Sequence, residues 1–202
     1  MLSCVTRCAA LLWLAAQGLA PLAAMSAQGV PSAPAGVRGG GGDQAELTAF
    51  RDAVSGYLEV RKKISLELPP MRVTPRAAEI NAASDALARA VQRARPNARQ
   101  GVFFTPEVSS VIRRQLAQAL ASTDRAGVIA LLNEEEPTVR RPTIHMRFPA
   151  GAVLASTPAV LLDALPPLPP ELEYRFIGRI LVIRDIHAAL ILDYLSPALP
   201  AS

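Results

Sequence analysis

The placement of the cysteines constrains this chain more than any other feature. The only two, Cys4 and Cys8, lie in an N-terminal segment that has the pattern of an export signal. Arg7 supplies its positive charge, the stretch that follows is apolar as far as Leu22, and small residues continue to Ala27. Removal of this segment leaves a chain without cysteine, in a compartment where small proteins commonly form disulfides. The mature protein must therefore be stabilised by packing.

The expected organisation is a signal peptide over residues 1–24, a disordered leader over 25–43 and a single domain over 44–200. The apolar stretch of the signal is too short for a good membrane span, and no cysteine stands at its end for lipid attachment. The leader consists mainly of Ser, Ala, Pro and Gly. We expect an exported protein, periplasmic or secreted, without stable membrane insertion after signal cleavage.

The charge of the chain is nearly balanced. Formal net charge is +4, and only two of the basic residues are lysines. This composition does not indicate nucleic-acid binding, which needs a clustered basic face. Many basic residues occur in pairs: Lys62 with Lys63, Arg89 with Arg93, Arg113 with Arg114, and Arg140 with Arg141. If the fold disperses these pairs, they are ordinary solvated helix surface. If the fold brings them together, they could bind an anionic envelope component.

Helical periodicity dominates residues 44–133. Apolar residues recur at three- and four-residue steps from Gln44 to Ile64, and two prolines then end this helix. Thr-Pro pairs at 74–75, 105–106 and 157–158 are typical of helix starts, because threonine can cap an amide and proline has none to lose. We expect further helices over 75–95, with Ile80 and Leu87 inward, 106–121 and 124–133, the last burying Leu131.

Over residues 137–200 the long helical pattern gives way to short segments separated by prolines. A small helix is expected over 158–164, followed by an extended proline run at 166–170. Alternation of apolar and charged residues over 172–176, a turn at Gly178 and a β-rich run over 180–183 predict two antiparallel strands. Residues 189–195 suit a strand or a helix, with the strand slightly favoured. The fold class is α+β, with three or four N-terminal helices packed against a small C-terminal antiparallel meander.

No enzyme signature is present in the sequence, neither a nucleophile elbow nor a metalloprotease motif nor a phosphate-binding loop. The two histidines, His145 and His187, are too few for an ordinary zinc site. Asp185, Asp193, Glu173 and Arg184 are interpreted as salt-bridge partners on an exposed sheet face. The sequence therefore assigns no catalytic, cofactor-binding or metal-binding residue.

The C-terminal half resembles a family of uncharacterised exported bacterial proteins. The resemblance covers about residues 100–200 and implies a signal peptide and a shared fold, but no activity. The matching positions are Gln100 to Glu107 with Arg113-Arg114, the LPPLPPELEYRFIGR block from Leu165 to Arg179, Leu181 with Arg184-Asp185, and Leu190-Ile191 with Asp193.

Residues 172–195 are also loosely similar to the end of the periplasmic nickel and cobalt homeostasis proteins. In that family a strand, a glycine turn, a strand ending in Asp and a last apolar strand follow one another. The similarity implies three strands rather than a terminal helix. It does not transfer metal binding to a chain with two histidines and no cysteine after cleavage.

The function expected from the sequence is a non-enzymatic envelope protein that binds another exported protein or an anionic envelope component, without a cofactor. An exposed face or an unpaired edge of the meander would serve as the binding surface. Two alternatives stay open: a hydrolase-like enzyme using Asp185 and His187, and a periplasmic metal-responsive factor. The candidate interaction face comprises Tyr174, Arg175, Arg179, Arg184 and Asp185.

Overall fold

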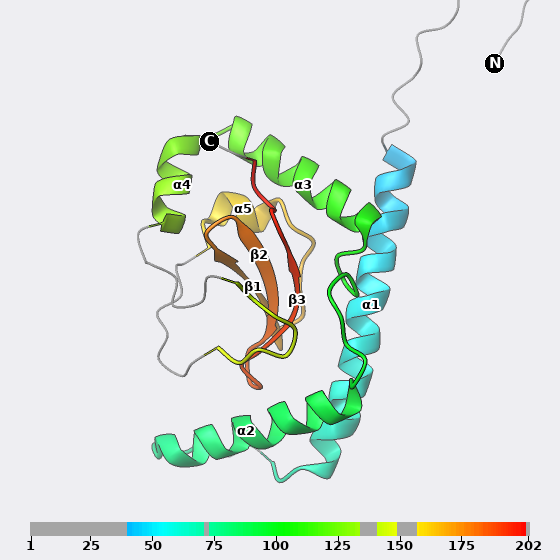
Figure 1. Cartoon of the computed structure of the whole chain (residues 1–202), viewed down its shortest axis with the longest axis vertical. Helices are drawn as coiled ribbons and strands as arrows, with labels where there is room; N and C mark the ends of the chain where they lie inside the picture. The colour runs from blue at the N-terminus through cyan, green and yellow to red at the C-terminus, as the bar shows by residue number, and fades with distance from the viewer. Residues whose placement is uncertain (1–39, 71–72, 134–140, 149–156, 201–202) are drawn as a thin grey trace, which may run out of the picture. The chain divides into compact units, whose positions relative to one another are not determined.

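The computed structural model describes residues 40–70, 73–133, 141–148 and 157–200, which all belong to one compact unit. The expected signal peptide and most of the expected leader lie outside these residues. Helices precede a three-stranded antiparallel sheet (Figure 1), which confirms the α+β class. None of the described helices is long and apolar enough to cross a bilayer. The helices are α1 (Gly40–Glu67), α2 (Ala77–Ala94), α3 (Pro106–Ala121), α4 (Arg125–Asn133) and α5 (Ala159–Asp163); the strands are β1 (Leu172–Ile177), β2 (Ile180–Asp185) and β3 (Leu190–Leu195).

Helix α1 begins earlier than the sequence predicts. It starts at Gly40 rather than at Gln44, so the last four residues assigned to the leader are helical. Asp43 in the first turn forms an ion pair of 2.5 Å with Arg114 of α3, and a carboxylate in this position also favours the positive end of the helix dipole. These two interactions offset the low helix propensity of the glycines.

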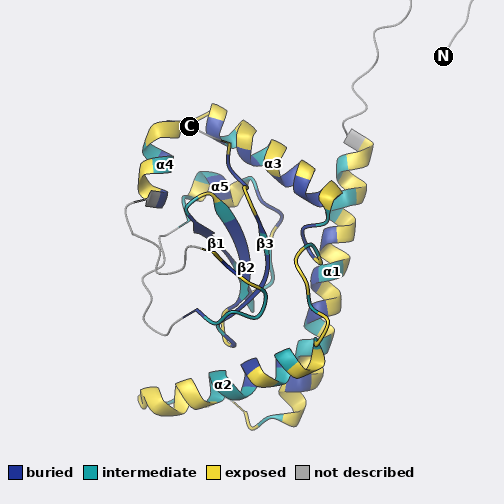
Figure 2. Ribbon diagram, viewed as in Figure 1, coloured by how far each residue is buried: buried dark blue, intermediate teal, exposed yellow. Residues whose placement is uncertain are grey.

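The Thr-Pro pairs predict the start of α3 well and the start of α2 poorly. Helix α3 begins at Pro106, and the Thr105 side chain accepts a hydrogen bond from the Val108 amide at 3.3 Å. Helix α2 begins two residues after the expected Pro75, because the Thr74 hydroxyl accepts from the Arg76 amide in a turn that precedes the helix. The first turns of α2 are exposed (Figure 2), so the expectation of a buried Ile80, here 46% exposed, is wrong. Leu131 of α4, 49% exposed, is likewise not buried.

The sheet has the order β1-β2-β3, and both neighbouring pairs are antiparallel. Gly178 closes the first hairpin at a φ of +56°, which glycine adopts without steric cost. The strand interpretation of residues 189–195 is confirmed. The pairing of β2 with β3 shifts at Ile183 and Arg184, which pair with Asp193 and Ile191, so Leu192 of β3 is the extra residue of a bulge. This shift decides which side chains of β3 face inward.

The two faces of the sheet pack differently. The inner face contacts the helices and contains Tyr174, Leu181 and Ile183 within the main core. The outer face carries a smaller apolar cluster made by Ile177, Val182 and Ile191 with Phe148 from the preceding segment. A sheet buried on both faces gives nearly continuous apolar strands, which explains why β2 and β3 contain so few polar residues.

The outer edge of β3 is already paired with this chain. The amides of His145 and Phe148 donate to the carbonyls of Ile191 and Ala189, both at 2.9 Å. The Ile191 amide donates to the Met146 carbonyl, also at 2.9 Å. Residues 145–148 therefore occupy the backbone groups that a partner strand would need at this edge.

Candidate functional site

The interaction face expected on the meander is largely internal. Tyr174 is buried and donates its hydroxyl to the Pro166 carbonyl at 3.0 Å. Asp185 has no exposed surface. The expectation that these two residues lie on an exposed face is wrong, because they share the inner face of the sheet with Leu181 and Ile183 and are buried in the core. Only the three arginines of the expected face retain exposure.

These arginines have partners. Glu173 pairs with Arg175 at 2.7 Å and with Arg184 at 2.8 Å, as the salt-bridge interpretation expected for Glu173 and Arg184. The guanidinium of Arg179 donates twice to the Leu199 carbonyl, at 2.6 and 3.1 Å. All three guanidinium groups therefore hold the sheet and the C-terminal segment in place.

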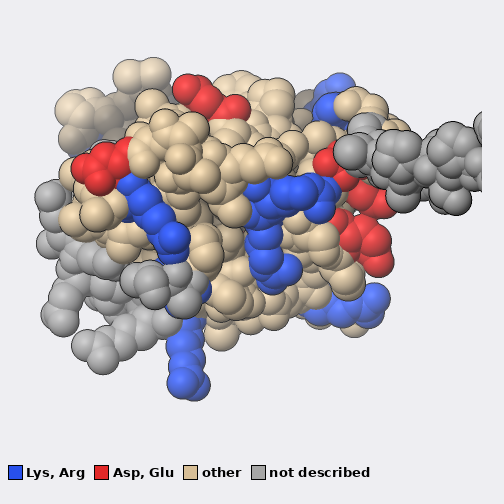
Figure 3. All heavy atoms as spheres, turned by 90° about the horizontal axis from the view of Figure 1, so that it is seen from above, with Lys and Arg blue, Asp and Glu red and all other residues tan. Residues whose placement is uncertain are grey.

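The pairs of basic residues do not gather on one face. Lys62 and Lys63 lie near the end of α1, whereas Arg114 contacts Asp43 at its beginning; nineteen residues of helix correspond to about 28 Å. Arg89 and Arg93 belong to α2. Figure 3 shows basic side chains in separate groups on the face it presents. Arg140 lies outside the described residues.

Asp185 is the centre of a buried polar cluster at the end of β2. Its Oδ2 accepts hydrogen bonds from the Tyr57 hydroxyl and from Arg61 Nε, both at 2.7 Å. Its Oδ1 accepts from the Ala188 amide at 2.8 Å and so closes the turn into β3. Arg61 extends further to His187, with 3.1 Å between Nη2 and Nδ1. One carboxylate thus ties α1 to the β2–β3 turn.

The spacing of residues on α1 places this cluster. Tyr57, Arg61 and Ser65 follow one another at four-residue steps and therefore share one face of the helix. Burial, followed by the charge of Asp185, raises the pKa of the Tyr57 hydroxyl well above its usual range. Tyr57 therefore stays protonated and acts as a hydrogen-bond donor to the carboxylate.

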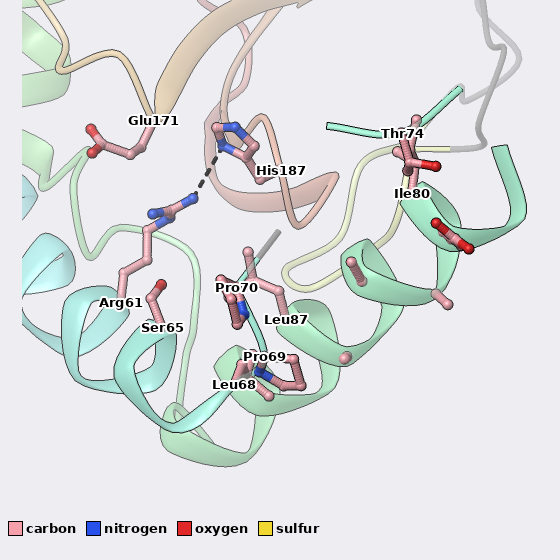
Figure 4. Close-up of a pocket in the computed structure, with 14 residues that line it drawn as sticks. Arg61, Ser65, Leu68, Pro69, Pro70, Thr74, Ile80, Leu87, Glu171 and His187 are labelled. Atoms are coloured by element: carbon pink, nitrogen blue, oxygen red, sulfur yellow. Dashed lines mark hydrogen bonds between the residues drawn. The ribbon is translucent and has the colours of Figure 1, made fainter. Parts of the chain in front are cut away.

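A cavity of about 700 Å³ opens beside this cluster. The end of α1, helix α2 and the β2–β3 turn surround it (Figure 4). Its polar end carries Arg61, Ser65 and His187, whereas aliphatic side chains form most of the remaining wall. This volume is within the range of small-molecule sites, which combine an apolar body with a few convergent polar groups. The aliphatic wall consists of Leu68, Pro69, Pro70, Ile80, Ala82, Ala83, Ala86 and Leu87.

The polar end of the cavity offers hydrogen-bond donors. The guanidinium of Arg61 can only donate, so His187 Nδ1 accepts and the neutral ring carries its proton on Nε2. Arg61 has five N–H groups, of which Nε–H binds Asp185 and one on Nη2 binds His187. Its other three have no hydrogen-bond partner among the described residues. The Glu171 carboxylate points away from the imidazole (Figure 4).

This arrangement does not form a His–Asp dyad. A catalytic imidazole is oriented by a carboxylate on one nitrogen and faces a nucleophile with the other. Here Arg61 stands against His187 Nδ1, and both oxygens of Asp185 bind other groups. Ser65 and His187 share no hydrogen bond. The geometry gives no support to the hydrolase alternative at these two residues.

Each histidine lies beside a guanidinium. His145, with its Nε2 buried, adjoins Arg95, and burial followed by the charge of Arg95 lowers the pKa of this imidazole. His187 contacts Arg61. A neighbouring positive charge disfavours a divalent cation, and the described residues hold no group of three potential metal ligands.

A second buried carboxylate, Asp193 of β3, organises the loop before α3. It accepts hydrogen bonds from the amides of Phe103 at 2.7 Å and of Gly101 and Phe104 at 2.9 Å. The Tyr194 amide donates to it at 2.8 Å. The expectation that Asp193 lies on an exposed face is wrong, because the loop covers it. Because Asp193 accepts hydrogen bonds from four backbone amides, we assign it a structural role.

Comparison of the chain with protein-family models, curated proteins and solved structures gives no match. The functional interpretation therefore depends on the site geometry. The row of polar groups that Tyr57, Arg61 and Ser65 form on α1 is not among the features predicted from the sequence. Their four-residue spacing beside the predicted core face is the signal that could have identified this row.

Proposed function

We propose that the protein is an exported, non-enzymatic binding protein of the cell envelope, and that its ligand binds in the cavity between α1, α2 and the β2–β3 turn. Export is inferred from the N-terminal pattern of charge, apolar residues and small residues. The binding site differs from the meander surface that the sequence favours, because that surface is largely buried or paired.

One observation carries the proposal. Arg61 and His187 present N–H groups at one end of a cavity whose other walls are aliphatic. Asp185 holds Arg61 at 2.7 Å and is itself held by the Tyr57 hydroxyl at 2.7 Å, so the donor end is rigid before a ligand arrives. Groups that are positioned in advance lose little conformational entropy on binding.

The exposed apolar surface of α2 supports the same assignment. Ile80 is 46% exposed and lines the cavity, where the sequence periodicity predicts a core position. An apolar helix face that the rest of the domain does not cover is typical of a binding site. A bound ligand would remove this surface from water and gain the corresponding hydrophobic free energy.

The proposal is tested with Nile red, a neutral apolar dye whose fluorescence rises in an apolar site. We expect saturable binding to the mature protein and loss of most of it in Ala83→Phe, because the added ring fills the cavity. Ala78→Phe is the matched control, since Ala78 is an exposed residue of the same helix that does not line the cavity. Equal dye binding by both variants would place the site elsewhere and contradict the proposal.

A further inference from the structure

We propose that the ligand of this cavity is a single-chain aliphatic carboxylate, with its carboxylate on Arg61 and His187 and its hydrocarbon chain along α2. This inference rests on the proposed function and adds the chemical class of the ligand. Three features of the cavity lead to it: the donors at one end, the charges around them and the backbone of the walls.

The donors suit a carboxylate. Arg61 retains three N–H groups, and His187 carries a proton on Nε2 when neutral, so donors from two side chains converge on the polar end. The planar guanidinium fork matches the two oxygens of a carboxylate and can bind both at once. Ser65, one turn beyond Arg61 on α1, adds a hydroxyl to the same end.

The charges around the cavity favour one negative charge over two. Asp185 already balances much of the charge of Arg61 at 2.7 Å. Glu79 and Glu171 also line the cavity. Arg76 balances the charge of Glu79 at 2.9 Å, whereas the described residues place no cation against Glu171. A phosphate dianion would therefore meet uncompensated like charge, whereas a monocarboxylate adds a single charge next to Arg61.

The walls favour a hydrocarbon chain over a peptide. They come mainly from two helices, whose interior amides and carbonyls bond within each helix, and from Pro69 and Pro70, which have no amide hydrogen. Peptide groups lying along Ile80 and Leu87 would leave water without new partners, which is costly. A chain of methylene groups has no hydrogen bonds to lose.

If the ligand binds by burying methylene groups, its affinity should depend on its chain length. Each methylene that enters an apolar wall should tighten binding about fourfold. Octanoate, decanoate and dodecanoate should therefore displace Nile red at successively lower concentrations until the chain fills the cavity. The Ala83→Phe variant should lose this dependence on chain length, because its ring occupies the same space, and Ala78→Phe should keep it.

The head group is tested with decanoate, decanol and decyl phosphate against the mature protein. We expect decanoate to bind about tenfold to hundredfold more tightly than decanol, because hydrogen bonds to a charged group are strong, and more tightly than decyl phosphate. In His187→Leu the ratio of decanoate to decanol affinity should fall, whereas in His145→Gln, which lies outside the cavity lining, the ratio should stay as in the wild type.

The outcomes separate the two proposals. Nile red binding that is sensitive to Ala83→Phe, together with equal affinities for decanoate and decanol, would overturn the carboxylate class and leave the binding function standing. Tighter binding of decyl phosphate, or of a leucine and alanine pentapeptide with a free carboxylate, would also overturn it. If neither the dye nor any of these compounds bound, both proposals would fail.

Discussion

Tyr57 on α1 and Asp185 on β2 lie 128 residues apart in the sequence and are joined by a hydrogen bond of 2.7 Å. The same carboxylate binds Arg61 and the Ala188 amide, so it connects α1 to the β2–β3 turn. Because Arg61 and His187 form the polar end of the cavity, the geometry of the proposed site depends directly on this one buried group.

Neutralising Asp185 should destabilise the fold. Asp185→Asn keeps the shape of the side chain but leaves Arg61, whose side chain is only 13% exposed, without its counter-charge. Breaking a buried ion pair in this way costs about 3 kcal/mol of the free energy of unfolding. Urea unfolding followed by circular dichroism measures the change.

The control for this variant is Asp43→Asn. Asp43 pairs with Arg114 at the surface, where the two side chains are 36% and 48% exposed. An exposed pair contributes less than about 1 kcal/mol. Similar losses in the two variants would contradict the role assigned to the buried cluster.

Asp193 should control the order of the loop before α3. In Asp193→Ala the amides of Gly101, Phe103 and Phe104 lose their shared acceptor. Each buried group left without a partner costs about 1–3 kcal/mol, so we expect a clear loss of stability. Amide hydrogen exchange measured by NMR should accelerate first at these three residues. Uniform acceleration across the domain, without a local excess, would argue against this assignment.

The order of elements and much of the core could be predicted from the sequence because periodicity records which side of an element is buried. In α3, the predicted bounds match those of the structure, and the apolar residues at helical spacing are all buried: Val108, Val111, Ile112, Leu116 and Leu120. Asp185 could also have been found in this way. It follows Leu181 and Ile183 at steps of two, which places it on the inner face of β2 with them.

Other features depend on contacts that one sequence does not reveal. Leu192 and Asp193 both face inward, because the bulge opposite Ile183 and Arg184 breaks the alternation of β3. Ile80 has the spacing of a core residue, but among the described residues no element buries that turn of α2, and its side chain is 46% exposed. Ile80 is therefore exposed to the cavity rather than packed in the core.

Alkaline pH should unfold the protein through two tyrosines. Burial raises the pKa of Tyr57 and of Tyr174 far above the ordinary value of about 10. Above that pH the unfolded chain releases both protons while the folded protein retains them, so the unfolded state binds fewer protons. Stability should therefore fall with rising pH, by about 1.4 kcal/mol per pH unit for each tyrosine.

Single substitutions separate the two contributions. Tyr57→Phe and Tyr174→Phe should each remove about half of the alkaline slope, even where the variant is less stable at neutral pH. The measurement is the free energy of unfolding in urea between neutral pH and about pH 11. A slope that neither variant changes would show that other groups cause the alkaline loss.

His145 should contribute to acid sensitivity. Burial and the charge of Arg95 lower the pKa of its imidazole. Below the unfolded value of about 6.5 the unfolded chain gains a proton that the folded protein does not yet bind. The contribution of this group to stability is therefore complete above that pH and is lost as pH falls. His145→Gln should lose less stability between pH 7.5 and pH 5.5 than the wild type, and an equal loss would contradict this.

Export makes a prediction about the N-terminus of the purified protein. The pattern of Arg7, an apolar stretch and small residues before Ala27 predicts cleavage near Ala24. Protein recovered from a periplasmic or secreted fraction should begin there by intact mass, and it should react with no thiol reagent, because Cys4 and Cys8 leave with the signal. Replacing two apolar residues of the stretch with arginine, in Leu11→Arg and Leu14→Arg, should keep the full-length chain in the cytosol. Full-length wild-type protein in the cytosol would contradict export, and with it the assignment of the cavity to an envelope ligand.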